Sequence, residues 1–305
     1  MNCCLTVPAS EALLSRYARP ETIEEAVDLL ATGTWRILAG GTDFYPAQGN
    51  RPIRENILDL DRLAALTDIR ALDDHIFIGA RASWTDVMRA DLPPAFDALK
   101  LAAREVGSIQ IQNRGTVGGN LCNASPAADG VPPLLALDAE VELTSRNGRR
   151  VLPLEAFILG NRRTARDPGE LLTGLRIPRA SASGVSHFLK LGARSYLVIS
   201  IAMVAVRIAA ASDGRISEAA VAVGACSAVA QRLRRLETAI VGRPAGDEAL
   251  AAVADWAFDE LSPIDDVRGS ATYRRKAAAE LVRRALREAF TRLGDDLAGQ
   301  GRAVA

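Results

Sequence analysis

The chain has 305 residues, two histidines, and 37 basic side chains that balance 37 acidic ones. This length predicts about two domains, and the neutral balance argues against a protein that binds nucleic acid through overall positive charge. The four scattered cysteines and two separated histidines argue against a metal centre, an iron–sulfur cluster and a disulfide scaffold. Any redox chemistry would therefore depend on an organic cofactor or on a partner protein.

The amino-terminal start and the most apolar stretch bear on location. The start, MNCCLTVPAS, lacks the basic region and the long apolar core of a targeting sequence. The apolar run 197–211 is interrupted by Arg207 and is rich in β-branched residues, which predicts a buried strand and not a membrane span. We therefore expect a cytoplasmic protein with reduced thiols that contacts no membrane.

The first third of the chain alternates helix and strand patterns. A capping box at Thr22–Glu25 predicts the start of a helix that Gly33 ends, and a second capping box at Ser83–Asp86 predicts a short helix. Apolar runs predict three strands, at 35–39, 56–60 and 76–80. An amphipathic pattern predicts a longer helix at 94–106. This alternation indicates a domain that mixes helices with a sheet.

The middle of the chain holds its least ordinary segment, residues 109–137 (IQIQNRGTVGGNLCNASPAADGVPPLLAL). Its glycines, asparagines and prolines predict an ordered loop that is followed by an apolar run. Farther on, Asn147-Gly148 predicts a hairpin between strands at 140–145 and 149–152. A further strand is expected at 171–177, where Pro178 ends it.

From about residue 180 the strands come first and the helices follow, which is typical of an α+β domain. We expect strands at 186–191, 196–210 and 215–224, and helices at 228–241, 247–260 and 272–293. The polar stretch RASASG at 179–184 predicts a linker. The expected units are an amino-terminal domain (1–179, with subdomains 1–58 and 59–179), a carboxy-terminal domain (185–295) and a tail (296–305).

Two glycine-rich segments are candidates for binding an anion. We call Leu38–Asp43 (LAGGTD) the first glycine segment and Gly115–Asn120 (GTVGGN) the second glycine segment. Glycine permits positive φ and close approach to the backbone, and successive exposed N–H groups form an anion-binding nest. Two such nests suit a pyrophosphate, with Thr42 and Thr116 as further donors. Each segment taken alone is also compatible with a simple tight turn.

Other nucleotide and catalytic motifs are missing around these segments. Neither segment is GxGxxG or GxxxxGK[ST], so a Rossmann fingerprint and a P-loop are absent. No paired carboxylates, serine–histidine–aspartate set or cysteine–histidine pair stands near either segment. The residues alone therefore predict a dinucleotide site of a non-Rossmann kind.

Longer stretches around both segments resemble a known family. ILAGGTDF at 37–44 and GTVGGNLCNASPAADGVPPLLAL at 115–137 resemble the flavin-binding medium subunit of molybdenum hydroxylases, the family of xanthine dehydrogenase and carbon-monoxide dehydrogenase. The stretches LTGLRIP (172–178), FLKLGAR (188–194) and AVGAC (222–226) extend the resemblance over nearly the whole chain.

The resemblance implies a fold and a cofactor. The expected fold is α+β, with a two-subdomain FAD-binding domain of the vanillyl-alcohol-oxidase (PCMH) type and an α+β carboxy-terminal domain with an antiparallel sheet and helices. FAD would bind without a covalent link. The residues that the resemblance implies for FAD binding are Leu38, Ala39, Gly40, Gly41, Thr42, Asp43, Thr116, Gly118, Gly119, Asn120, Asn123, Asp129, Leu172 and Lys190.

Several of these positions also have simpler interpretations. Asp129, which can accept hydrogen bonds from FAD hydroxyls, could instead cap a helix, and Lys190 could be a surface lysine. Leu172 could be an ordinary core residue, and Asn123 a turn residue. The chain departs from many relatives after Arg194, where it reads Ser-Tyr in place of an early aspartate. Tyr196 therefore either stacks on the flavin ring or packs in a core or interface.

The function that the resemblance implies is electron transfer through FAD within a complex. A molybdopterin-binding large subunit and a [2Fe–2S] small subunit would be the partners, in a heterohexamer, with NAD or another compound as electron acceptor. Two alternatives remain: a self-contained FAD oxidase or reductase of the same fold, and a flavin-free interaction scaffold. Cys122, within the second motif, is expected to be a packing residue, and the basic helix at 273–293 a solvated helix or subunit contact.

Overall fold

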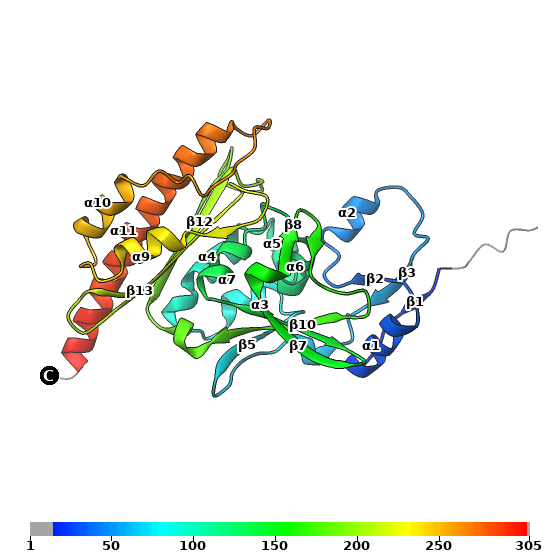
Figure 1. The fold of residues 1–305 in the computed structure, drawn as a ribbon. Coiled ribbons are helices and arrows are strands. Elements are labelled where there is room, and N and C mark those ends of the chain that lie inside the picture. Colours follow the sequence, from blue (N-terminus) through cyan, green and yellow to red (C-terminus); the bar gives the residue numbers. More distant parts are fainter. Residues whose placement is uncertain (1–14, 304–305) are drawn as a thin grey trace, which may run out of the picture.

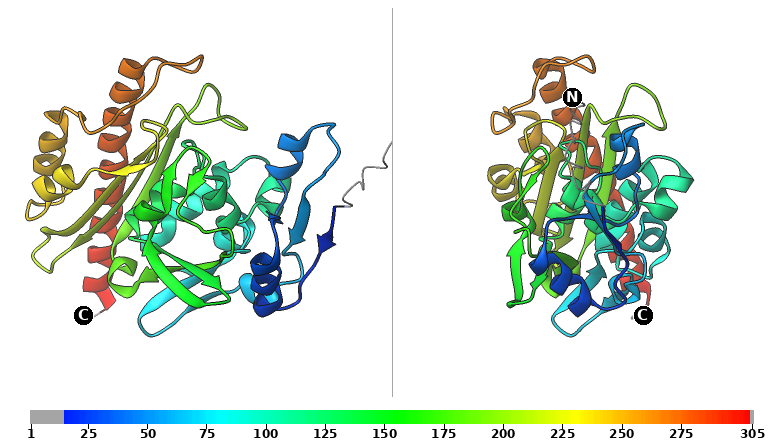
Figure 2. Two further views of the ribbon diagram at one scale, coloured as in Figure 1. Left: turned by 45° about the vertical axis from the view of Figure 1, so that its right-hand side comes forward. Right: turned by 90° about the vertical axis from the view of Figure 1, so that its right-hand side faces the viewer.

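The computed structural model describes residues 15–303, with side chains described up to residue 295. The amino-terminal start, with Cys3 and Cys4, lies outside these residues, and so does the expectation about a targeting sequence. In the described part, three main sheets follow one another along the molecule, from a small amino-terminal sheet to a carboxy-terminal sheet covered by a long helix (Figures 1 and 2).

The amino-terminal subdomain is built on a parallel sheet of order β1-β3-β2, in which the strands are β1 (Tyr17–Ala18), β3 (Asn56–Asp59) and β2 (Trp35–Leu38). Helix α1 (Ile23–Thr32) begins where Thr22 Oγ1 accepts the Glu25 N–H at 3.1 Å, as predicted. The Glu25 carboxylate accepts the Glu21 N–H at 2.8 Å, one residue before the expected partner. A short helix, α2 (Phe44–Gln48), directly follows the first glycine segment.

The second subdomain contains an antiparallel sheet of order β4-β5-β10-β6-β7, with β4 (Ile69–Ala71), β5 (His75–Gly79), β10 (Leu171–Pro178), β6 (Glu140–Ser145) and β7 (Gly148–Pro153). The predicted hairpin joins β6 to β7, and the predicted capping box at Ser83 begins α3. Its smaller elements are η1 (Ala64–Leu66), α3 (Trp84–Arg89), η2 (Pro94–Phe96), α4 (Asp97–Glu105), α8 (Leu154–Phe157), β8 (Ile158–Gly160) and β9 (Arg163–Thr164). Buried apolar side chains from the sheet and from α3, α4 and α8 form one core.

The segment 109–137 is helical, whereas the sequence predicted a loop before the apolar run. It forms α5 (Ile109–Arg114), α6 (Val117–Asn123) and α7 (Val131–Ala136). Thr116 caps α6, and the two prolines of α7 occupy its first turn, where a missing N–H costs nothing. The helices are short because turn residues separate them, and this hides the helical period from a sequence reading.

The carboxy-terminal domain is an antiparallel sheet of order β11-β12-β13-β14, with β11 (Val185–Leu191), β12 (Ala202–Ala210), β13 (Ile216–Gly224) and β14 (Gln231–Arg232). Its helices are α9 (Arg234–Ile240), α10 (Asp247–Ala254) and α11 (Ala271–Ala303). Alternate residues of β12 face opposite sides: Val204 and Val206 pack toward the helices, and Met203 and Ala205 pack toward α4 and α7. Among the described residues, no helix combines the length and the apolarity needed to cross a membrane.

Four boundaries in this domain differ from the sequence prediction by more than one residue. The strand expected from residue 196 begins at Ala202, because the preceding residues form a loop in which Leu197 has a φ of +51°. The helix expected from residue 228 is preceded by β14 and begins at Arg234, and α10 ends at Ala254 and not at residue 260. Helix α11 continues to Ala303, past the expected end at residue 293 and into the expected tail.

The stretch RASASG, the predicted linker, is short and partly helical, and its middle packs against the second subdomain. Residues Arg179–Ala182 form the 3-10 helix η3, and Ser181 is buried and donates a hydrogen bond to Asp138 Oδ2 at 2.8 Å. Gly184 has a φ of +80°, and a Cβ there would lie 2.2 Å from the Ile208 carbonyl oxygen. The chain therefore passes from one sheet to the next through a closely packed turn.

Candidate functional site

A cleft of about 960 Å³ lies between the amino-terminal subdomain and the helices of the second subdomain. Its volume is in the range of small-molecule and cofactor sites, roughly 300–1,000 Å³. The strand–turn–helix unit β2–α2 forms one wall, and α6 with the start of β10 forms the other. The expected site residues that line it are Ala39, Gly40, Gly41, Thr42, Asp43, Thr116, Gly118, Gly119, Asn120, Asn123 and Leu172.

The first glycine segment offers unpaired backbone donors to this cleft. Gly41 has a φ of +76°, which turns the chain sharply between β2 and α2. Within the described residues, none of the N–H groups from Gly40 to Phe44 donates a hydrogen bond, although the Gly41 carbonyl accepts the Tyr45 N–H at 3.2 Å. The segment is therefore a concave set of free donors, which is the property expected of an anion-binding nest.

The second glycine segment differs from the predicted nest because its backbone donors are already bonded. The N–H groups of Val117 and Gly118 donate to the carbonyls of Ala82 and Ala80, at 3.0 and 2.9 Å. The Gly119 N–H donates to Thr116 Oγ1 at 3.0 Å, the hydrogen bond that caps α6. What this segment can offer a ligand is the hydroxyl proton of Thr116 and the side chain of Asn120.

Glycine in both segments also permits close packing of the chain on itself. A Cβ on Gly40 would lie 1.9 Å from the carbonyl oxygen of Arg114, immediately before the second segment. A Cβ on Gly118 would lie 2.7 Å from the Ala80 carbonyl oxygen. Side chains at these positions would push apart the two walls, so these glycines position the site.

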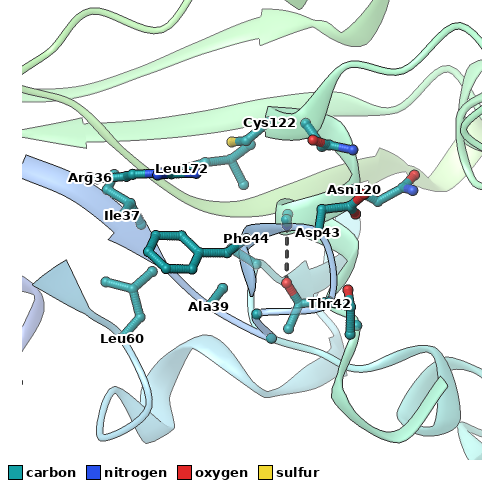
Figure 3. A pocket seen from close by; sticks show the side chains of 18 of the residues that line it. Arg36, Ile37, Ala39, Thr42, Asp43, Phe44, Leu60, Asn120, Cys122 and Leu172 are labelled. Carbon is teal, nitrogen blue, oxygen red and sulfur yellow. Dashed lines mark hydrogen bonds between the residues drawn. The ribbon is translucent and has the colours of Figure 1, made fainter. Parts of the chain in front are cut away.

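The side walls of the cleft are partly apolar. In Figure 3, Ile37, Phe44 and Leu60 lie below Leu172 and Cys122. The Arg36 guanidinium lies 4.2 Å from the centre of the Phe44 ring, a cation–π contact. These surfaces suit a flat ring system with an adjacent polar edge.

Arginine is the commonest charged residue around the cleft. The arginines that line it are Arg36, Arg54, Arg81, Arg162 and Arg166, against the two carboxylates Asp43 and Glu55. The excess of positive charge favours an anionic ligand. These arginines are not apparent as a site in the sequence, because they come from separate strands and loops and no local pattern connects them.

Two further polar groups in the cleft are informative. Asn120 Oδ1 is buried and has no hydrogen-bond partner among the described residues, which leaves an acceptor for a ligand hydroxyl or N–H group. Cys122 lines the cleft, and burial of its thiol among the surrounding side chains raises the pKa of that thiol to about 11. A protonated thiol fits the expected packing role better than a nucleophilic one.

Three expected site residues, Leu38, Asp129 and Lys190, do not line the cleft. Leu38 is buried in β2. Asp129 and Lys190 form a buried ion pair, with 2.7 Å between Oδ2 and Nζ, and the Ser200 hydroxyl donates to Asp129 Oδ1 at 2.7 Å. Burial raises the pKa of Asp129, and Lys190 opposes that shift.

This arrangement excludes the simpler interpretations of both charged residues. Asp129 caps no helix, since Gly130 is the first residue before α7 and no side chain caps it. Lys190 is no surface lysine, because its side chain is only 6% exposed. Tyr196 is 77% exposed on the loop before β12 and does not reach the cleft.

Comparison with known proteins identifies the family. Residues 11–180 match the family "FAD binding domain in molybdopterin dehydrogenase", and residues 187–289 match the "CO dehydrogenase flavoprotein C-terminal domain". The chain is 32% identical to the nicotine 6-hydroxylase medium subunit of Paenarthrobacter nicotinovorans, over 91% of this chain and 98% of that protein. It is 30% identical to the carbon monoxide dehydrogenase medium chain of Hydrogenophaga pseudoflava, over 90% of this chain and 97% of that one.

Solved structures agree with these sequence matches. The reconstituted CO dehydrogenase from Oligotropha carboxidovorans contains a chain that superimposes with a TM-score of 0.83 at 30% identity. The superposition covers 94% of this chain and 100% of that chain. The expected fold, an FAD-binding domain followed by an α+β carboxy-terminal domain, is therefore confirmed.

The residues of the cleft fit FAD. The volume accommodates a dinucleotide, the free N–H groups between Gly40 and Phe44 suit its pyrophosphate, and the unpaired Asn120 oxygen suits a hydroxyl of its ribityl or ribose part. The same observations argue against a flavin-free scaffold, in which unpaired donors and a buried acceptor would have no purpose. This chain belongs to the FAD-binding medium subunits of the molybdenum hydroxylase family.

Proposed function

We propose that this chain transfers electrons through FAD inside a molybdenum hydroxylase complex, from a [2Fe–2S] small subunit to NAD or another acceptor. The observation that carries the proposal is a cleft that fits a dinucleotide but holds little acid–base machinery, with Asp43 as the one carboxylate outside an ion pair among its described lining residues. Among the described residues that line it there is no histidine, and Glu55 is paired with Arg36 at 3.4 Å. Bound FAD supplies the redox chemistry, and the chain supplies binding and orientation.

Different residues of the cleft would bind different parts of FAD. The pyrophosphate would accept hydrogen bonds from the backbone of the first glycine segment and from the hydroxyls of Thr42 and Thr116. Asn120 and Asn123 would contact polar groups beside it, and Leu172 would lie against a ring. Leu38, which is buried in β2, would support the wall of the cleft without contacting FAD.

Asp129 and Lys190, which do not line the cleft, would act indirectly by holding the loop before β12 in place. Their ion pair joins the end of β11 to the residues before α7, and Ser200 ties the far end of the loop to the same carboxylate. The pair would therefore fix the position of the loop that carries Tyr196.

The substrate would be chosen by the large subunit. Three relatives of this chain are named for nicotine, carbon monoxide and caffeine, which are three different compounds, although the matched subunits are similarly close to this chain at 30–32% identity. If this subunit selected the substrate, the relatives would be expected to differ more in their similarity to this chain. The proposed assembly is a heterohexamer of two copies each of the large, medium and small subunits.

The domain division that we propose is 1–179 and 185–295. Separate apolar cores lie on the two sides of this boundary, one among the strands β4–β10 and one between the carboxy-terminal sheet and its helices. A third contact, largely of alanines, joins α4 and α7 to β11–β13.

Co-expression with the neighbouring subunits tests the complex. The tagged chain should co-purify with molybdenum, iron and FAD, as measured by metal analysis and by flavin release in acid. Substrate-dependent flavin bleaching should then be rapid in the complex and absent for the chain alone. Bleaching of the isolated chain by an organic substrate would contradict the relay and support the self-contained oxidase or reductase.

FAD binding by the isolated chain can be followed separately. Trp35 and Trp84 both line the cleft, so FAD should quench their fluorescence, whereas Trp256 packs in the carboxy-terminal domain and should contribute a constant background emission. Protein refolded with excess FAD that retains no flavin and shows no quenching would refute the cofactor site.

A further inference from the structure

We infer that Arg162 binds the pyrophosphate of FAD from the α6 side of the cleft, an assignment that rests on the FAD site proposed above. Arg162 lies in the turn between β8 and β9, and it lines the cleft. Nothing in its local sequence marks it as a binding residue, since it is one of three arginines in NRRTAR. Three structural observations single it out.

The first observation is its backbone conformation. Arg162 has a φ of +59°, in the left-handed region that residues other than glycine, asparagine and aspartate adopt only rarely. A side chain held in this region is a common feature of ligand sites, where the surrounding structure imposes the conformation. The tight β8–β9 hairpin accommodates this conformation, which fixes the backbone from which the Arg162 side chain extends.

The second observation is how this conformation is held. The Arg162 N–H donates to the carbonyl of Ala124 at 3.0 Å, and Ala124 itself has a φ of +47° at the end of α6. Helix α6 contributes Cys122 and Asn123 to the cleft immediately before that residue. Two left-handed residues are thus bonded to each other, and they fix the turn against a wall of the site.

The third observation is the state of the guanidinium group. Arg162 is exposed and makes no side-chain hydrogen bond or ion pair within the described residues. Other arginines of the cleft are engaged: Arg81 with Asp61 at 3.2 Å, and Arg166 with the Glu170 carbonyl at 2.7 Å. Arg54 is also without such a contact, but its φ is not positive and no comparable constraint holds its turn.

The chemistry of the two groups matches. A guanidinium presents a planar set of N–H donors that binds phosphate oxygens in pairs, and it stays charged at any relevant pH. The first glycine segment supplies neutral backbone donors from the β2–α2 wall, and Arg162 would supply the positive charge from the α6 wall. A dianionic pyrophosphate held from both walls would also close the cleft around the cofactor.

The test compares Arg162→Gln with Arg163→Gln in the full-length chain. Arg163 is the next residue, is also exposed and unpaired among the described residues, and does not line the cleft, so both variants remove one charge from the same β8–β9 hairpin. The probes are FAD and riboflavin, which lacks the phosphates, titrated into apoprotein with tryptophan fluorescence as the readout. Thermal unfolding of each apoprotein checks that the fold is kept.

The expected result is a weaker affinity for FAD in Arg162→Gln, by about 10- to 100-fold, as for the loss of a charge-assisted hydrogen bond. Riboflavin affinity should stay unchanged, Arg163→Gln should match wild type for both ligands, and Arg162→Lys should lose less than Arg162→Gln because it keeps the charge. Equal FAD affinity in Arg162→Gln and Arg163→Gln would overturn the assignment. So would an equal loss of FAD and riboflavin affinity in Arg162→Gln.

The same titration separates this assignment from the proposed function. Wild-type protein that binds no FAD refutes the cofactor site itself, and no variant is needed to see it. Wild-type protein that binds FAD, together with an Arg162→Gln variant that binds it equally well, refutes only the role of Arg162.

Discussion

In the first glycine segment the N–H groups from Gly40 to Phe44 have no hydrogen-bond partner within the described residues, whereas in the second every N–H from Val117 to Asn120 is bonded inside the protein. The two stretches have similar compositions, and the sequence predicted the same nest for both. The first ends a strand at a glycine with positive φ, and the second begins a helix whose first turn is capped by Thr116.

This difference teaches that glycine-rich segments can serve a ligand site in two physical ways. One way exposes backbone donors, which needs a conformation that leaves N–H groups unpaired. The other lets two backbones approach closely, which needs the missing Cβ and consumes the donors. A substitution should therefore reduce FAD affinity in the first case and stability in the second, and the following variants test that division.

The largest effect is expected for Gly40→Ala, which belongs to the first segment but packs against the residue before the second. The added Cβ would lie 1.9 Å from the Arg114 carbonyl oxygen, a backbone atom that cannot move alone. We expect the free energy of unfolding of the apoprotein to fall by about 3 kcal/mol, as for severe overpacking. Urea unfolding followed by circular dichroism measures it. Gly169→Ala, where nothing lies within 4 Å, is the control and should change little.

Gly41→Val should act mainly on the cofactor. Its Cβ would come closest to the ring of the exposed Tyr45, at 2.8 Å, a side chain that can move aside. Valine cannot easily keep a φ of +76°, however, so the free donors would turn away. We expect a loss of FAD affinity of at least about tenfold, equivalent to one hydrogen bond to a charged group.

The matched control for that variant is Gly214→Val, in the β12–β13 turn. Gly214 has a φ of +78° and open space around it, so the backbone strain is the same but the cleft is distant. Equal loss of FAD affinity in both variants would show that global strain, and not the first segment, is responsible.

A pair of threonine substitutions compares the two glycine segments with smaller expected changes in stability and FAD affinity. Thr116→Val removes the cap of α6 and should lower the free energy of unfolding by about 1 kcal/mol. Thr42 makes no hydrogen bond among the described residues, so Thr42→Val should leave stability unchanged and weaken FAD binding severalfold. Melting temperatures and FAD titrations of both variants are the measurements, and a stability loss in Thr42→Val would contradict the division.

The smallest effect concerns the sheet beneath the first segment. Tyr17 on β1 donates a hydrogen bond to Asp59 on β3, which together with burial raises the pKa of Tyr17 to about 12. Since the folded pKa exceeds the unfolded value of 10.0, this contribution is complete below pH 10 and is lost between about pH 10 and 12.

Tyr17→Phe should therefore flatten the pH dependence of stability in that alkaline window. Tyr17 is 59% exposed, so the difference should stay below about 1 kcal/mol. Urea unfolding of wild type and variant at several pH values between 9 and 12 measures it. Parallel curves through this range would mean that the Tyr17–Asp59 contact contributes nothing.

Local patterns predicted many of the elements, because local interactions decide them. The capping of α1 by Thr22, the capping box of α3 at Ser83 and the Asn147-Gly148 hairpin depend on residues within four positions of one another. The prediction was wrong for 196–201, where an apolar stretch leads into the loop before β12. Strand propensity there is overridden by the left-handed conformation of Leu197, which turns the chain before β12.

In the candidate site, too, residues in local motifs were predicted from the sequence, whereas contacts between residues that only the fold brings together were not. Both glycine segments and Leu172 were found from the sequence and its family resemblance, and they line one cleft. Lys190 and Asp129 stand 61 positions apart, and only the fold brings them together as a buried pair. The arginines of the cleft were missed for the same reason, since each comes from a different element.

The sequence by itself determined the family, the α+β fold, the cofactor and most of the short-range structure. Each of these depends on motifs or on contacts between residues near in the chain. Only the tertiary structure decided which N–H groups remain free, which glycines are needed for packing, and which charges face the cleft. Hydrogen bonds such as those from Val117 to Ala82 and from Gly118 to Ala80 join segments about 35 residues apart, and their formation is a property of the packed chain and not of any local pattern.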